Sequence, residues 1–166
     1  MPLSLNEIRT RAIAFSQEWK TEGSEDAEAK TFWDQFFNIF GIPRRRVASF
    51  EHHIPKQDGR EGYIDLLWKG TLLVEHKSRG KDLSRAYRQA TDYFPGLKDH
   101  ELPKYVIVCD FHSFKLYNLD EGEKLGRSIS QAVLLLYCRA LSLDGWCCKL
   151  YEVLVEQRRG KGRILS

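Results

Sequence analysis

Cysteines and long hydrophobic runs are scarce in this sequence. Its four cysteines lack C-x-x-C spacing and two of them are adjacent, which disfavours both a zinc ribbon and a disulfide framework. The N-terminus carries Asn6, Glu7 and Arg9 where a secretory signal would be apolar, and no run reaches transmembrane length. We therefore expect a soluble, cytoplasmic protein with reduced thiols and no membrane partner.

Internal repeats, heptad series and low-complexity tracts are also absent from the sequence, which excludes a solenoid, a coiled coil or a long disordered arm. With 166 residues, of which 42% are hydrophobic, the chain has the size of one compact domain. Charged residues make up 30%, and the formal net charge is only +3. This mildly basic balance permits nucleic acid as a partner without requiring it.

Two amphipathic helices are predicted at the N-terminal end. Ser4 and Glu7 form a capping-box pattern, and apolar residues then recur at helical spacing over 5–20. A second helix is predicted over 24–40, because this segment has a wide aromatic face and is followed by a glycine and a proline. A short strand over 46–54 comes next, since β-branched and aromatic residues are frequent there.

The middle of the sequence predicts a mixed sheet. Residues 62–78 contain two apolar runs separated at 69–70, the pattern of a hairpin that is covered on both faces. Helical periodicity over 82–94 precedes two strands within 104–119, which predicts a right-handed parallel crossover. The expected fold class is α/β (α+β), a central mixed sheet with a hairpin and a crossover helix flanked by N-terminal helices.

The C-terminal part follows a different pattern. The apolar stretch 129–143 predicts one more helix, residues 146–155 fit a helix or a strand, and the chain ends in a basic tail. We divide the chain into a core at 1–121 and a divergent C-terminal extension at 122–166, which we expect to pack on the same domain.

Three charged residues lie within the apolar runs of the predicted hairpin. Asp65 and Glu75 stand on its two strands, and Lys77 follows Glu75 by two positions. Two carboxylates and an amine on neighbouring strands suit a hard divalent cation beside a positioned positive charge, which is what phosphodiester hydrolysis requires. Glu75 and Lys77 share one face of a strand, whereas the His76 side chain points away and only its backbone carbonyl is a candidate metal ligand.

The length of the hairpin loop decides whether the two carboxylates meet. A two-residue loop would place Asp65 and Glu75 on opposite faces of the hairpin. A three-residue loop at 69–71 instead pairs Trp68 with Leu72 and sets Asp65 directly opposite Glu75. We predict the three-residue loop, or a bulge with the same effect.

A structural ion pair is the alternative to a catalytic cluster. The spacing alone is weak evidence, since common charged residues often fall at a given spacing by chance. Their location within apolar runs is more informative, because burial of even an uncharged polar group without a partner costs about 2 to 7 kcal/mol. We therefore favour the catalytic interpretation.

Further candidates surround this cluster. Glu28 precedes the aromatic face of the second helix by one turn and is a candidate metal ligand, although an acid favoured by the helix N-terminus is an equal alternative. Donors for a DNA backbone occur in a short run after a proline and after the second hairpin strand. They are Arg44, Arg45, Arg46, Ser78, Arg79, Lys81, Arg85 and Arg88, for which a solvated basic surface is the alternative.

The order of elements and the pattern Asp65, Glu75-x-Lys77 resemble the PD-(D/E)XK nuclease superfamily, whose core is a helix, a mixed sheet and a crossover helix. More narrowly, four segments resemble the N-terminal endonuclease domain of the MmeI-like, type IIL restriction-modification enzymes. They are NEIRTRAIAFSQEW, FWDQFFNIFGIPRRRVASF, GYIDLLWKGTLLVEHKSRGKDL and QATDYFPGL. The resemblance covers about residues 5–120.

The resemblance implies a restriction-endonuclease-like fold and a Mg²⁺-dependent endonuclease, with Mn²⁺ as an expected substitute. The catalytic residues would be Asp65, Glu75 and Lys77. Gln89 and Tyr93 match a Q-x-x-x-Y pattern beside the active site of several superfamily members, which implies a supporting role, with ordinary helix packing as the alternative. The products would carry 5′-phosphate and 3′-hydroxyl ends.

The same family joins its nuclease to a methyltransferase that uses S-adenosylmethionine and to a target-recognition domain. This sequence contains no N-P-P-Y-type motif and no glycine-rich cofactor loop, so no S-adenosylmethionine site is expected in it. We expect double-stranded DNA as the partner, with methylation and specificity supplied by a separate chain or domain. Cutting both strands needs two active sites, which favours a homodimer.

Two other interpretations stay open. A repair or recombination nuclease acting on branched or free DNA ends is one, since the Q-x-x-x-Y pattern also occurs in such relatives. A non-catalytic DNA-binding or assembly module is the other, because the sequence from Gly122 onward departs from the family pattern.

Overall fold

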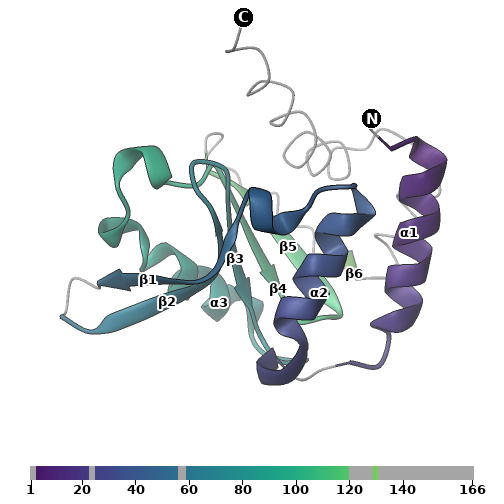
Figure 1. The fold of residues 1–166 in the computed structure, drawn as a ribbon. Coiled ribbons are helices and arrows are strands. Elements are labelled where there is room, and N and C mark those ends of the chain that lie inside the picture. Colours follow the sequence, from purple (N-terminus) through teal and green to yellow (C-terminus); the bar gives the residue numbers. More distant parts are fainter. Residues whose placement is uncertain (1–2, 23–24, 56–58, 120–128, 131–166) are drawn as a thin grey trace, which may run out of the picture.

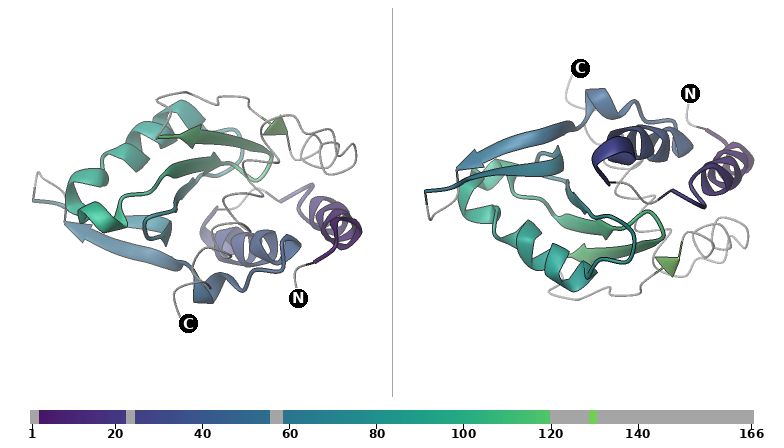
Figure 2. Two further views of the ribbon diagram at one scale, coloured as in Figure 1. Left: turned by 90° about the horizontal axis from the view of Figure 1, so that it is seen from above. Right: turned by 90° about the horizontal axis from the view of Figure 1, so that it is seen from below.

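A mixed sheet lies between two layers of helices (Figures 1 and 2). α1 (Leu5–Glu18) and α2 (Glu25–Ile39) cover one face, and α3 (Leu83–Thr91) covers the other. The predicted arrangement of a mixed sheet with a hairpin, a crossover helix and flanking N-terminal helices is confirmed. The computed structural model describes residues 3–22, 25–55, 59–119 and 129–130.

The six strands follow chain order within the sheet. Neighbours pair in antiparallel fashion except β3 and β4, which are parallel and are connected through α3, so the predicted crossover is present. The strands are β1 (Ser49–Pro55), β2 (Glu61–Trp68), β3 (Leu72–His76), β4 (Tyr105–Cys109), β5 (Ser113–Asn118) and β6 (Ile129–Ser130). The 3-10 helices η1 (Arg44–Arg46), η2 (Phe94–Gly96) and η3 (Asp99–Glu101) lie in the connections.

An aromatic core holds α1 and α2 against the sheet. The predicted capping box starts α1, since the Ser4 side chain accepts from Glu7 N and the Glu7 carboxylate accepts from Ser4 N at 2.7 Å. Residues that recur at helical spacing then turn one face of each helix inward. Their fully or nearly buried rings are Phe15, Trp19, Phe32, Trp33, Phe36, Phe37 and Phe40.

A second, smaller core lies beneath α3. Its buried residues Leu83, Ala86 and Ala90 recur at helical spacing and pack with Leu73 of β3 and Val106 of β4. The alternating residues of β3 therefore serve two cores, one on each face. This double coverage explains why β3 is fully buried along its length.

The loop between β2 and β3 has the predicted three residues. Trp68 pairs with Leu72, and Gly70 adopts a positive φ of 69°, a conformation that favours glycine. The loop is fastened to η3, because Gly70 N donates to the Glu101 backbone oxygen at 3.0 Å and Lys69 Nζ contacts Glu101 Oε1 at 2.5 Å. The hydrogen bond from Lys69 lowers the pKa of Glu101 to about 2.

Three predicted boundaries were wrong. The helix expected over 82–94 ends at Thr91, and residue 94 begins η2. The strand expected from residue 46 begins at Ser49, because Arg44–Arg46 form η1 instead. Residues 129 and 130, expected to start a helix, pair with β5 as the short strand β6. The remainder of the predicted C-terminal helix and tail lies outside the described residues, and the division at residue 121 stays a prediction. Within the described part, no helix is long and apolar enough to cross a membrane.

Candidate active site

The predicted acidic pair lies where β2 and β3 separate. Paired residues run from Trp68 and Leu72 at the loop to Leu66 and Val74, so the next position along the same register sets Asp65 against Glu75. The predicted register is therefore confirmed as far as Leu66, and it directs both acids to the same place.

Asp65 closes the gap between the diverging strands with its side chain. Lys77 N donates to Cys109 O of β4 at 2.8 Å, so the neighbouring N–H, that of His76, points the other way, toward β2. Asp65 Oδ2 accepts from His76 N at 2.6 Å. A carboxylate thus replaces a backbone carbonyl as the partner of β3, and it lies against the main chain between Glu75 and Lys77.

Glu75 and Lys77 form a close ion pair. Lys77 Nζ donates to Glu75 Oε1 at 2.6 Å, and the Glu75 side chain is fully buried whereas that of Lys77 is 21% exposed. A buried carboxylate requires a nearby positive charge to offset the loss of hydration. The pair therefore places a lysine ammonium at the surface and a carboxylate directly beneath it.

Tyr93 and Gln89 face this cluster from the segment at the end of α3. Gln89 Nε2 donates to Tyr93 Oη at 3.1 Å, and Tyr93 is 3% exposed. Burial raises the pKa of Tyr93, and the hydrogen bond from Gln89 opposes this shift. Tyr93 packs in the same core as Leu73, which shares a strand face with Glu75, so the phenol lies on the side of the sheet to which Glu75 points.

His76 points to the opposite face of the sheet, as predicted. Its Nδ1 accepts from the Trp33 indole N–H of α2 at 2.9 Å, and its ring meets Phe111 edge-on with 4.2 Å between centroids. Within the described residues its Nε2 has no hydrogen-bond partner. This imidazole joins β3 to the aromatic core and is not available as a general base at the cluster.

The buried imidazole makes the fold sensitive to acid. Burial, followed by the charge of Lys77, lowers the pKa of His76 from 6.5 to about 3. Because the unfolded chain then binds the proton first, stabilisation is complete above pH 6.5 and is lost as the pH falls toward 3. We expect this group to lower the free energy of unfolding by up to about 1.4 kcal/mol per pH unit in that window.

Urea denaturation of the wild type, His76→Gln and His112→Gln at neutral pH and at about pH 5 checks this expectation. The exposed His112 is the matched control. The His76 variant should lose less stability on acidification than the other two proteins, and an equal loss in all three would contradict the assignment.

Other candidate ligands are less well placed. No group of three or more His, Cys, Asp and Glu side chains suited to a metal ion occurs in the part of the chain that the structure describes. Glu28, which is half-buried near the start of α2, therefore does not join Asp65 and Glu75 in such a group. Of the predicted metal ligands, Asp65, Glu75 and the His76 backbone carbonyl remain as candidates.

The predicted DNA-binding residues fall into two classes. Arg44 is engaged inside the chain, because its guanidinium pairs with Asp34 at 2.7 Å, donates to Ala48 O at 3.0 Å and lies over the Phe50 ring. Its side chain is 9% exposed, which argues against the predicted phosphate contact. Arg79 is exposed but donates to Lys20 O at 2.8 Å.

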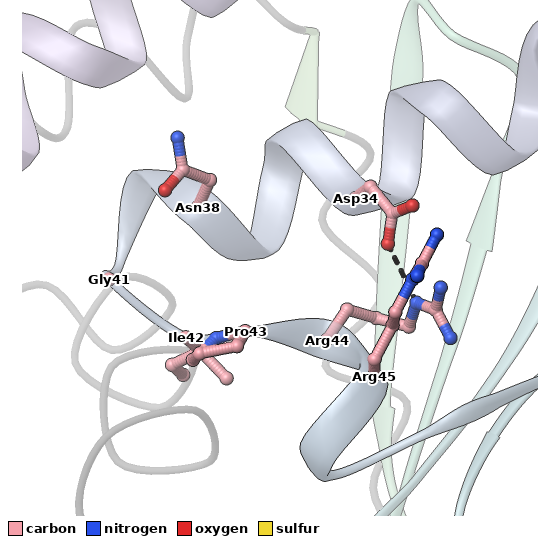
Figure 3. Close-up of a pocket in the computed structure, with 7 residues that line it drawn as sticks. All are labelled: Asp34, Asn38, Gly41, Ile42, Pro43, Arg44 and Arg45. Carbon is pink, nitrogen blue, oxygen red and sulfur yellow. Dashed lines mark hydrogen bonds and ion pairs between the residues drawn. The ribbon is translucent and has the colours of Figure 1, made fainter.

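The remaining basic candidates are exposed to solvent. Arg85 and Arg88 lie on the exposed face of α3, opposite its buried residues. The others are Arg45, Arg46 and Lys81, while Ser78 is half-buried. Arg45 lines a pocket between the end of α2 and η1 with Asp34, Asn38 and neighbouring residues (Figure 3). The residues Asp65, Glu75 and Lys77 do not line this pocket.

Two contacts near the cluster were not anticipated from the sequence. One is the Trp33–His76 hydrogen bond, which joins residues 43 positions apart and leaves no local signal. The other involves Asp110, expected only as part of a strand, whose buried carboxylate accepts from Gly80, His112 and Ser113. An acid just before a short turn is a recognisable signal for the latter two bonds.

The fold and the cluster together define a mixed α/β domain whose central hairpin carries two acids and a lysine where its strands diverge. The chain belongs to the family described as "MmeI, N-terminal domain", whose family model matches residues 10–137. The resemblance to MmeI-like proteins is thereby confirmed. The matched range extends beyond residue 121 into the C-terminal extension.

Among solved structures, the chain is similar to one described as "cryoEM structure DrdV-DNA complex". The sequence identity is 13% and the TM-score is 0.45. The similarity covers 82% of this chain and only 13% of that one, so the chain spans a small part of that protein's length. No curated protein matches the chain.

Proposed function

We propose that this chain is the DNA-cutting domain of a restriction-modification system, a Mg²⁺-dependent endonuclease of the PD-(D/E)XK type. Membership of the MmeI N-terminal domain family supports the setting. The chemistry is supported chiefly by one observation: the buried Glu75 carboxylate pairs with Lys77 Nζ at 2.6 Å, and Asp65 bonds to His76 N between them, at the point where β2 and β3 diverge. Asp65 also bonds to the backbone of β3, but the Glu75–Lys77 ion pair does not itself require a second acid beside it.

The chemical nature of these groups suits a magnesium ion. Mg²⁺ prefers oxygen ligands and is commonly held by one or two carboxylates, with water and substrate phosphate completing its shell. Asp65 and Glu75 would supply the carboxylates. The His76 carbonyl would supply a third oxygen, since the N–H and C=O of one strand residue point to the same edge and this N–H meets Asp65. When bound, the ion would neutralise phosphate charge and favour ionisation of a water.

We assign to Lys77 the role of orienting the attacking water and a phosphate oxygen. Its Nζ already donates to Glu75, so the amine is held beside the carboxylate that would bind the metal. The positive charge at a partly exposed position would also stabilise the negative charge that develops on the phosphate during attack. Hydrolysis would leave a 5′-phosphate and a 3′-hydroxyl, with the water oxygen joined to phosphorus.

Gln89 and Tyr93 are assigned a supporting role. The raised pKa keeps the Tyr93 phenol protonated, and the bond from Gln89 occupies its oxygen as an acceptor, so its own O–H is directed to another group. A donor fixed in this way beside the two carboxylates can hold either an acid or a phosphate oxygen in place. Exposed Arg85 and Arg88 on the same helix are assigned contacts with the DNA backbone.

Cleavage of supercoiled plasmid by the full chain tests this proposal. We expect nicked and linear products with Mg²⁺ or Mn²⁺, no products with a chelator, and ends that DNA ligase reseals. Linear and branched DNA in parallel reactions separate a plasmid-cutting endonuclease from an enzyme of free ends or junctions. Binding of duplex DNA without cleavage in either metal would contradict the proposal and favour a non-catalytic DNA-binding module.

A further inference from the structure

The loop that follows Lys77 is held in one conformation from several sides. Residues 78–82, here called the exit loop, connect β3 to α3 and carry Ser78, Arg79 and Lys81. Lys81 N donates to Ser78 O at 3.2 Å within the loop, and Arg79 fastens it to the Lys20 carbonyl. Ordering such a loop in advance lowers the entropic cost of binding a ligand to it.

Asp110 supplies the contact from the sheet. Its Oδ2 accepts from Gly80 N at 3.0 Å in the exit loop, and its Oδ1 accepts from His112 N at 3.3 Å and Ser113 N at 2.7 Å, where the turn after β4 enters β5. The residue is only 6% exposed. One buried carboxylate therefore connects two loops that are 30 residues apart in the sequence.

The position of Asp110 continues the pairing of β3 with β4. The last backbone pair is His76 with Cys109, and Lys77 N still donates to Cys109 O at 2.8 Å. Beyond this point the strands separate, and the Asp110 side chain takes over the connection by reaching Gly80. The orientation of the exit loop relative to Lys77 is thus set by the residue immediately after β4.

A carboxylate is required for this double contact. Its two oxygens are both acceptors, and here each faces backbone N–H groups of a different loop. An asparagine in the same place has one acceptor oxygen and one amide nitrogen that only donates, so either Gly80 or Ser113 would meet a donor. Bonds from N–H groups to a charged acceptor are also stronger than those to a neutral one.

We propose that Asp110 is a positioning residue that holds the exit loop so that Ser78 and Lys81 contact DNA phosphates beside the catalytic cluster. This inference rests on the proposed function, because it names the DNA-binding segment of that same site. Asp110 itself touches no substrate. Its effect passes through Gly80, whose positive φ of 80° allows the chain to turn back toward α3.

Duplex binding by the full chain, with a chelator to prevent cleavage, tests this role. Fluorescence anisotropy over a range of salt concentrations compares the wild type with Asp110→Asn and with Asp99→Asn, an exposed aspartate in η3 that serves as the matched control. We expect Asp110→Asn to weaken binding about tenfold. Its log-log salt slope should fall by about 0.9 for each DNA phosphate that the variant no longer neutralises. Asp99→Asn should behave as the wild type.

A double-mutant cycle separates positioning from general destabilisation. If Asp110 acts through the exit loop, its substitution should cost little further affinity in a Lys81→Gln background, whereas independent effects would add. In cleavage assays Asp110→Asn should raise KM more than it lowers kcat. Additive effects on binding, or an unchanged affinity and salt slope in Asp110→Asn, would overturn the inference.

Gly80→Ala provides a second variant in case Asp110→Asn does not fold. An added Cβ at Gly80 meets no atom within 4 Å, so its effect is confined to the strain of a positive φ in the exit loop. We expect the same reduced salt slope, and an unchanged slope would count against the inference. If the wild type does not bind DNA, the proposed function is overturned. If Lys77→Ala abolishes cleavage but Asp110→Asn leaves DNA binding unchanged, only this inference is overturned.

Discussion

Replacing Lys77 with alanine is expected to lower the rate of DNA cleavage by about 10²- to 10³-fold, the effect of removing one preorganised donor from a charged transition state. The variant loses the ammonium that orients water and phosphate, while Asp65 and Glu75 stay in place to bind the metal. Single-turnover cleavage of plasmid at saturating Mg²⁺ measures the loss at the chemical step.

The same change also affects stability, and a second variant separates the two effects. Glu75 is fully buried, and removing the partner of a buried charge costs about 3 to 5 kcal/mol. The double substitution Glu75→Gln with Lys77→Met removes both charges and is expected to restore much of that stability without restoring cleavage. Lys69→Met, which removes the partner of Glu101 at the far end of the hairpin, is the matched control and should cleave normally. Cleavage by the charge-free double variant would contradict a catalytic role.

Truncation of Phe32 to alanine is expected to be the most destabilising change in the aromatic core, at about 3 to 5 kcal/mol. The side chain is fully buried on the inner face of α2, and its loss leaves a cavity that rigid neighbouring rings cannot fill. The rings in contact with it are those of Phe15, Trp19, Trp33, His76, Phe111 and Phe114. Urea denaturation gives the free energy of unfolding directly.

Ile13→Ala is the control for this experiment. Ile13 is 37% exposed on α1, so its truncation should change the free energy of unfolding by about 0.5 kcal/mol or less. A loss below about 1 kcal/mol in Phe32→Ala would mean that the core relaxes around the missing ring, contrary to the close packing described above.

The position of the acidic pair could be predicted because strand geometry is local. Side chains alternate along a strand, so the length of one loop determines which residues face each other across a hairpin. Requiring Asp65 to meet Glu75 predicted the pairing of Trp68 with Leu72, and the structure has this pairing. Helix α1 was predicted equally well, since the capping box of Ser4 and Glu7 lies within four residues.

Features that depend on contacts between distant segments could not be predicted. Arg44 was assigned to DNA because it lies in a basic run, but Asp34 and the Phe50 ring engage it in the folded chain. Arg44 lies in η1, which occupies the positions where the strand was expected to start, so β1 begins only at Ser49. Propensity within a short window carries no information about such partners, so tertiary contacts overrode the local pattern.

The same reason applies to the surroundings of the site. The bond from Trp33 to His76 and the bond from Gly80 to Asp110 each join residues that are at least 30 positions apart. Phe111, in the turn after Asp110, adopts a positive φ of 65° while its ring packs on Trp19 and His76. Burial of the ring offsets the strain of a backbone conformation that is rare for phenylalanine.

A crystal of the full chain soaked in Mn²⁺ tests the central claim most directly, because the anomalous signal of the metal locates it independently of any assay. We expect one strong peak with carboxylate oxygens of both Asp65 and Glu75 and the His76 carbonyl oxygen about 2.0 to 2.3 Å away. The peak should be absent from an Asp65→Asn crystal that is otherwise unchanged. A peak elsewhere, or carboxylates of Asp65 and Glu75 too far apart to share one ion, would contradict the proposed metal site.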